Sequence, residues 1–321
     1  MNQSQSAAHA SKLVSSKTAK SGPLSARLAK HKYIYLLLAP GVLYFLIFKY
    51  GPMWGLVLAF QNYNPFGGVW KSEFVGLAHF SELLKSDYFL IMLRNTFFIN
   101  LFGLVFYFPL PVVLAVLLNE VRVELFKRIS QSVIYLPHFL SWVVVASVTY
   151  FVLSYEVGFI NKLYQTLGWA RIPFLSKTDY FWGILTAQTI WKEAGWGTII
   201  FLAAVSGVDP QRYEAAVIDG ASRFRQVWHI TLPAIRPTIL ILLILRLGSM
   251  ADVGFEQVVL MMNPQVISVA EVFDTYSFNQ GILLGQYSVG VTVGIFKGII
   301  GLIFVLVSNY IVKKLGHEGI Y

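Results

Sequence analysis

Ionisable side chains interrupt two long apolar stretches of the sequence, residues 181–205 and 238–262. Charged groups at membrane depth are costly, and they normally face a cavity or one another. Two interpretations stay open: a polar lining along a solute pathway, or a structural ion pair between two helices. The residues concerned are Lys192, Glu193, Arg246, Asp252 and Glu256.

The spacing of the charges within 238–262 predicts that they share one helix face. At about 100° per residue, Arg246, Asp252 and Glu256 fall, together with Ser249, within about a third of the helix circumference. Because the two stretches carry their charges at matching depths, we expect Lys192 or Glu193 to meet Arg246 or Asp252.

The sequence offers no catalytic chemistry of its own. It contains no cysteine, which excludes disulfides, thiolate metal sites and a cysteine nucleophile. No Ser–His–Asp triad or pair of carboxylates can be assembled, and no phosphate-binding loop of the form G-x-x-x-x-G-K-[S/T] occurs. We therefore predict no catalytic residue, no metal and no cofactor in this chain, so that any ATP would be bound by another chain.

The composition is that of a membrane protein. Only 13% of the 321 residues are charged and 56% are hydrophobic, whereas a soluble domain carries about 25% charged residues. No stretch shows the alternation of a membrane β-barrel. The expected fold class is all-α, with six transmembrane helices of about 20 residues or more. The expected spans are 33–60, 96–118, 133–153, 181–205, 238–262 and 290–312.

Lysine and arginine predict the orientation. Fifteen of them lie in the N-terminal arm 1–32, in loops 119–132 and 206–237 and in the tail 313–321, against six in the opposite loops. This excess places both termini in the cytoplasm. The arm lacks an apolar core, so no cleavable signal peptide is expected. The net charge is +9, and the basic residues lie at the flanks of the apolar runs, which argues against a nucleic-acid partner.

Loop 206–237 has the pattern of two short helices. Asp209 is suited to cap the first helix, Pro210 to occupy its first position, and Gly220 to end it in the left-handed conformation. Ser222 is suited to cap a second helix, which Pro233 is expected to stop. By these signals alone, the loop is an ordinary interfacial connection between two spans.

Within this loop, Glu214-Ala215-Ala216, then Gly220, then Ile230-Thr-Leu-Pro233 resembles the cytoplasmic coupling loop of ABC importer permeases. In that family, a short helix of the loop docks into a cleft of the ATPase subunit. The resemblance implies ATPase-coupling roles for Glu214, Ala215, Ala216, Asp219, Gly220, Leu232 and Pro233.

The resemblance covers nearly the whole chain and is strongest to the maltose-type, binding-protein-dependent subgroup for oligosaccharides and polysaccharides. It rests on segments such as Lys49-Tyr-Gly-Pro-Met53 and Ile190-Trp-Lys-Glu-Ala-Gly-Trp196. At Thr275–Asn279 the chain departs from the subgroup, which more often has an aromatic residue followed by Arg. Asn279 is included with the charged residues as a candidate for the substrate pathway.

The family plan implies a bacterial inner-membrane complex. Its expected partners are a second homologous permease, two ATPase subunits that bind ATP and Mg, an external solute-binding protein and a saccharide. The resemblance favours an acidic saccharide such as alginate oligosaccharides, with a neutral oligosaccharide as the main alternative. A secondary transporter acting alone would use Asp252 and Glu256 for ion coupling, and a membrane-embedded enzyme would need a cluster of acidic or His residues that is not evident.

Overall fold

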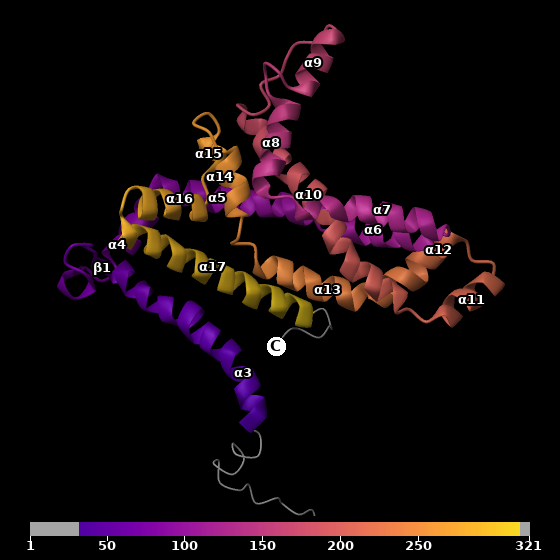
Figure 1. Ribbon diagram of the computed structural model, residues 1–321, viewed down its shortest axis with the longest axis horizontal. Coiled ribbons are helices and arrows are strands. Elements are labelled where there is room, and N and C mark those ends of the chain that lie inside the picture. The colour runs from indigo at the N-terminus through magenta and orange to yellow at the C-terminus, as the bar shows by residue number, and fades with distance from the viewer. Residues whose placement is uncertain (1–31, 315–321) are drawn as a thin grey trace, which may run out of the picture. The chain divides into compact units, whose positions relative to one another are not determined.

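The computed structural model describes residues 32–314 and is mostly helical, as expected (Figure 1). Its one sheet in this range is a short antiparallel pair, in which Gln61 of β1 (Gln61–Asn62) faces Phe74 of β2 (Glu73–Phe74). The predicted arm 1–32 and tail 313–321 lie almost entirely outside the described residues. Residues up to Gly55 form one compact unit and residues from Leu56 onward a second, and each is described by itself.

The first unit contains most of the first predicted span, up to Gly55. An α-helix, α3 (Lys32–Phe45), continues as a π-helical turn, η1 (Leu46–Tyr50), and then as the 3-10 helix η2 (Gly51–Phe60), which crosses into the second unit. The helix type thus changes at Gly51-Pro52. Because proline lacks an N–H and fixes its φ angle, it disfavours a continuous α-helix at this point.

Within the described residues, four helices are long and apolar enough to cross a membrane: Lys32–Phe60, Asp87–Glu120, Arg223–Gly248 and Tyr287–Lys314. A bent helix pair could supply a fifth crossing. A further helix, α10 (Thr178–Ser206), has 29 residues, which is sufficient length for a sixth. It contains Lys192 and Glu193, and these charges lower its apolar character.

The second predicted span begins earlier than residue 96. Helix α5 (Asp87–Phe102) is capped by Ser86, whose hydroxyl accepts a hydrogen bond from the Tyr88 amide. It continues through a π-helical turn, η4 (Gly103–Tyr107), into α6 (Pro109–Glu120). The turn ends at Tyr107, two residues before Pro109, where the missing proline N–H would interrupt the ladder of α-helical hydrogen bonds.

The third predicted span, 133–153, is wrong as a straight helix. Helix α7 (Glu124–Tyr135) ends in a 3-10 turn, η5 (Leu136–Phe139), and α8 (Trp142–Leu153) departs from them at an angle of 101°. Pro137 and the Ser141 cap, whose hydroxyl accepts from the Val144 amide, explain the break.

The fifth predicted span, 238–262, is displaced. One continuous helix consists of α12 (Arg223–Gln226), the π-helical turn η6 (Val227–Thr231) and α13 (Leu232–Gly248). Pro233 therefore lies inside this helix and does not stop it. The π-helical turn η6 directly before α13 lies where the missing proline N–H would interrupt an α-helical ladder. The helix ends at Gly248, and the chain turns before α14 (Phe255–Met261).

Helix α10 lies at the centre of the second unit and packs against α5, α6, α7 and α13. It approaches α7 closely: a Cβ at Gly195 would lie 2.0 Å from the carbonyl oxygen of Ile134. Small residues permit such contacts between membrane helices. Helix α17 (Tyr287–Lys314) packs on α13 and α16 (Phe273–Phe278). The remaining elements are η3 (Val69–Lys71), α4 (Ala78–Lys85), α9 (Phe159–Thr166), α11 (Pro210–Ile218), α15 (Ile267–Ala270) and η7 (Asn279–Leu283).

Candidate functional site

The loop between α10 and α12 forms the helix that the sequence predicts. Asp209 caps α11 through its Oδ1, which accepts a hydrogen bond from the Gln211 amide at 3.0 Å, and Pro210 is the first helical residue. Gly220 ends the helix at φ +72°. The Ala221 amide donates to the Ala216 carbonyl and the Gly220 amide to the Val217 carbonyl, which together form a Schellman cap.

Side-chain contacts hold this loop against the rest of the second unit. Arg223 Nη1 lies 3.1 Å from Glu120 Oε2 at the end of α6, and the Tyr213 hydroxyl lies 2.9 Å from the Thr231 hydroxyl at the start of α13. A groove of about 430 Å³ separates α11 from α12 and the end of α6, and Glu214 is among its lining residues. The loop is thereby attached to two of the long helices.

The outer surface of the loop is apolar and exposed. Ile218 is 86% exposed, and the rings of Phe224 and Trp228 stack at a centroid distance of 6.2 Å while both remain exposed. In Figure 1, α11 lies at the end of the second unit opposite to β1 and α4. Exposed apolar surface of this kind is typical of a site that contacts a protein partner or the membrane.

The predicted coupling residues separate into two groups. Glu214, Ala215, Asp219 and Gly220 are exposed on or beside α11, and Ala216 is half-buried there. Leu232 instead packs inward against the core cluster around Ile235 and Phe201, while Pro233 is exposed in the first turn of α13. The first group is accessible to a partner. Leu232 instead packs α13 against α10, the two long helices that flank the loop.

The charged residues of α10 pair with the break between α7 and α8. His138 Nδ1 donates to Glu193 Oε2 at 2.7 Å, and its ring stacks on Trp196 at 4.4 Å. Lys192 Nζ lies 3.3 Å from Glu193 Oε1, donates to the His138 carbonyl at 2.6 Å and lies 5.4 Å from the centre of the Trp142 ring. These contacts fix the sharp bend onto α10.

A second charged cluster joins three other elements. Lys297 of α17 lies 2.5 Å from Asp252 Oδ1, in the turn after α13, and 2.7 Å from Asp274 Oδ1 of α16. Asp274 is not among the site residues predicted from the sequence. Nothing in its local pattern points to Lys297, because the two residues are 23 positions apart and meet only through the packing of α16 on α17.

The predicted pairing of Lys192 or Glu193 with Arg246 or Asp252 is wrong, since the two charged clusters just described supply the partners. The prediction of one shared helix face also fails, because the helix ends at Gly248 and Glu256 begins a separate helix. A cavity of about 180 Å³ nevertheless brings Glu193, Arg246 and Asp252 together. Lys192, Glu256 and Asn279 do not line it.

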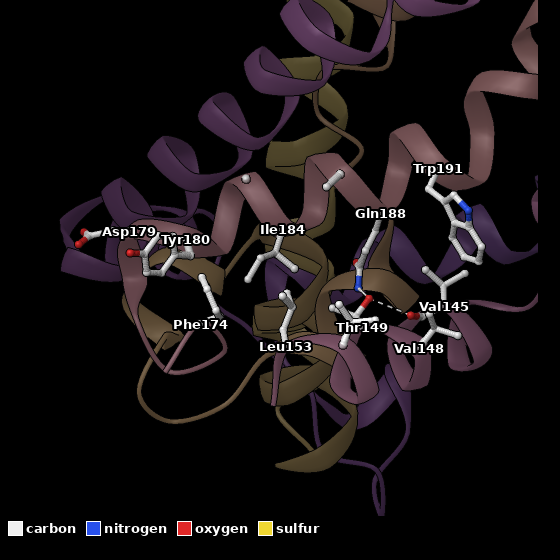
Figure 2. A pocket seen from close by; sticks show the side chains of 13 residues that line it. Val145, Val148, Thr149, Leu153, Phe174, Asp179, Tyr180, Ile184, Gln188 and Trp191 are labelled. Carbon is white, nitrogen blue, oxygen red and sulfur yellow. Dashed lines mark hydrogen bonds between the residues drawn. The ribbon is translucent and has the colours of Figure 1, made fainter. Parts of the chain in front are cut away.

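A different groove, between α8 and α10, is almost wholly apolar (Figure 2). Its volume is about 470 Å³, and its polar contact is a hydrogen bond from Gln188 Nε2 to the Thr149 hydroxyl at 2.7 Å. Asp179 lies at one end, and none of the predicted pathway residues lines the groove. It therefore differs in chemistry from the charged cavity.

A buried carboxyl group lies outside the spans, beside α15. Glu271 Oε1 accepts a hydrogen bond from the Thr275 hydroxyl at 2.7 Å, and its backbone carbonyl accepts from Asn95 Nδ2 of α5 at 2.9 Å. Burial raises the pKa of Glu271, and the Thr275 hydrogen bond opposes this shift. These contacts anchor α15 to α5 and do not reach the charged cavity.

Known proteins resemble the chain over nearly its full length. It is 52% identical to Protein LplB of Bacillus subtilis (92% of this chain, 93% of that protein) and 50% identical to the polygalacturonan/rhamnogalacturonan transport system permease protein YteP of the same organism (92% of each). It is 35% identical to a chain in the crystal structure of a bacterial alginate ABC transporter bound to a periplasmic protein that carries alginate pentasaccharide. That match has a TM-score of 0.85 and covers 92% of this chain and 99% of the other.

The family model described as the inner membrane component of binding-protein-dependent transport systems matches residues 107–317. The match includes α10, the capped helix α11 and the cavity residues Glu193, Arg246 and Asp252, whereas the cavity residues from α5 and Gly103 precede it. It agrees with the resemblance stated from the coupling-loop motif. The chain therefore belongs to the family of inner membrane components of binding-protein-dependent transport systems, which are transport permeases.

Proposed function

We propose that this chain is the membrane-spanning permease subunit of an ATP-driven importer for an acidic oligo- or polysaccharide. The observation that carries the transport role is α11: a helix capped at both ends, held through the Tyr213 hydroxyl to Thr231, and exposing Val217 and Ile218. A helix held in this way can transmit a movement of a docked subunit to the long helices.

The chain needs partners in this proposal. A second permease completes the pathway, two ATPase subunits dock on the α11 loops and supply ATP and Mg, and an external binding protein delivers the saccharide. The periplasmic protein in the alginate transporter structure supports the last of these. Both termini face the cytoplasm in this arrangement, which agrees with the excess of Lys and Arg on that side.

The acidic nature of the saccharide is supported by the relatives. YteP, at 50% identity, is named for polygalacturonan and rhamnogalacturonan. A second solved bacterial ABC transporter, at 36% identity, is described as involved in the import of the acidic polysaccharide alginate. The arabinooligosaccharide permease AraP of B. subtilis, whose name gives a neutral sugar, is 30% identical. Uronate-containing chains are therefore the preferred substrate class, and neutral oligosaccharides are the alternative.

The substrate class is tested with the assembled complex and its binding protein in proteoliposomes. We expect trigalacturonate or an alginate trisaccharide to stimulate ATP hydrolysis several-fold, because a cationic group at membrane depth can bind a carboxylate. Galactotriose, which matches trigalacturonate in length but lacks its carboxylates, should give less than half of that stimulation. Stimulation by the neutral sugar with none by either uronate would refute the acidic substrate and leave the permease role intact.

The need for partners is tested with the purified chain alone. Because the sequence has no phosphate-binding loop, we expect no specific ATP binding, and reconstitution of this chain by itself should give no uptake. Equilibrium binding of labelled ATP and uptake under an imposed proton or sodium gradient measure both properties. Uptake by the lone chain that requires the gradient would favour a secondary transporter.

A further inference from the structure

Three cations lie in the long helices near the charged cavity, and two of them are already occupied. The Lys192 side chain is 7% exposed, pairs with Glu193 and donates to the His138 carbonyl. Lys297 is held between the carboxylates of Asp252 and Asp274. Neither ammonium group can bind a new anion without losing a protein partner.

Arg246 differs from both lysines. Within residues 32–314, its guanidinium makes no ion pair with a carboxylate and no hydrogen bond to an acceptor; its recorded contact is with the Tyr107 ring, 5.9 Å from the ring centre. It lines the cavity of about 180 Å³. A charged group at this depth without a protein counter-ion is expected to serve a ligand.

The backbone at the start of η4 leaves room for this guanidinium. A Cβ at Gly103 would lie 2.9 Å from Arg246 Nη2, closer than such atoms normally approach. Gly103 is in ordinary right-handed helical conformation, at φ −59° and ψ −41°, so the backbone itself does not require glycine. A side chain at residue 103 would therefore displace the flexible end of Arg246 from its present position.

The other walls of the cavity suit a sugar. Glu193 pairs with Lys192, and Asp252 shares Lys297 with Asp274. Both carboxylates are hydrogen-bond acceptors when ionised, so they can accept from sugar hydroxyls. Trp142 also lines the cavity and supplies an aromatic surface. The volume is below the roughly 300 Å³ of a small-molecule pocket, so the cavity can hold one acidic group with part of one sugar ring.

We propose that Arg246 is the carboxylate-binding residue of the substrate pathway, holding one uronate through its planar pair of N–H donors while Gly103 positions the guanidinium. This inference rests on the proposed import of an acidic saccharide and assigns that specificity to one side chain. Arginine is suited to the role because it binds carboxylates with two parallel hydrogen bonds and stays charged when partly buried.

The test uses three variants, Arg246→Gln, Arg246→Lys and Gly103→Ala, in the assembled complex with its binding protein. Half-saturation of uptake is measured with trigalacturonate and with galactotriose. We expect Arg246→Gln to raise half-saturation for trigalacturonate about 10- to 100-fold, because it removes charge-assisted hydrogen bonds. Arg246→Lys should raise half-saturation for trigalacturonate less, since lysine keeps the positive charge but lacks the planar pair of N–H donors. The values for galactotriose should change less than about twofold.

The glycine variant tests position separately from charge. Gly103→Ala keeps the arginine but displaces its guanidinium. We therefore expect a several-fold rise in the trigalacturonate concentration that gives half-maximal uptake, with normal assembly of the complex. Gly294→Ala is the matched control, because a Cβ there meets nothing within 4 Å. Arg171→Gln is the control for loss of an arginine, as Arg171 pairs with Glu156 in an outer loop.

The outcomes separate this inference from the proposed function. If the wild-type complex responds to trigalacturonate and Arg246→Gln responds equally, the inference is overturned and the function stands. If the wild type responds only to galactotriose, the acidic substrate class fails and the inference with it. Should Arg246→Gln fail to assemble, unchanged half-saturation in both Arg246→Lys and Gly103→Ala would overturn the assignment.

Discussion

Gly220→Val is expected to reduce substrate-stimulated ATP hydrolysis at least about tenfold, while the long helices stay folded. Gly220 ends α11 at φ +72°, where a β-branched residue is strained by roughly 1–2 kcal/mol. Nothing lies within 4 Å of a Cβ at this position, so the effect comes from the backbone and not from a collision. Valine would open the hydrogen bond from the Ala221 amide to the Ala216 carbonyl and change the direction of the helix end.

Gly220→Asn is the matched control, because asparagine tolerates the left-handed conformation better than valine. It should retain most of the stimulation. Ala216→Asp should also uncouple the complex, since it places a charge on the half-buried side of α11 without straining the backbone. ATPase assembly and stimulated hydrolysis are measured together in membranes. Wild-type values in both Gly220→Val and Ala216→Asp would remove the basis for the coupling role.

The local structure of the loop could be predicted from the sequence because its signals are local. Asp209, Pro210 and Gly220 each act within one helical turn, through a cap, a fixed φ angle and a left-handed conformation. The all-α class could be predicted equally well, since long apolar segments in lipid must satisfy their own backbone hydrogen bonds. These features do not depend on what lies elsewhere in the chain.

The charged site could be predicted only in part. The argument from about 100° per residue assumes an unbroken helix, whereas the chain turns between Gly248 and Gly254 and moves Asp252 and Glu256 off the face that carries Arg246. Glycine occurs often in membrane helices, so its presence does not reveal a break. The partners of Glu193 and Asp252 are His138 and Lys297, which tertiary packing alone brings near.

The second large effect concerns Lys192 and Glu193, the charged residues of α10 that contact the bend between α7 and α8. Glu193→Gln should destabilise the protein by about 3–5 kcal/mol, because it leaves Lys192 buried without its carboxylate. Lys192→Met should also cost several kcal/mol, since it removes the donor to the His138 carbonyl as well as the ion pair. Combining Lys192→Met with Glu193→Gln should cost clearly less than the sum of the two, because no unpaired buried charge then remains.

A double-mutant cycle in the purified, detergent-solubilised complex measures this coupling from thermal unfolding. The exposed pair Arg128 and Glu124 of α7 is the matched control, with side chains 74% and 68% exposed, and its coupling should be roughly 0–1 kcal/mol. The cycle of Glu193 with Arg246 should give a smaller coupling energy than that of Lys192 with Glu193, because the two residues share a cavity without forming an ion pair. Additive losses for Lys192 and Glu193 would contradict their ion pair. Strong coupling of Glu193 to Arg246 would instead mean that Arg246 has an internal counter-ion.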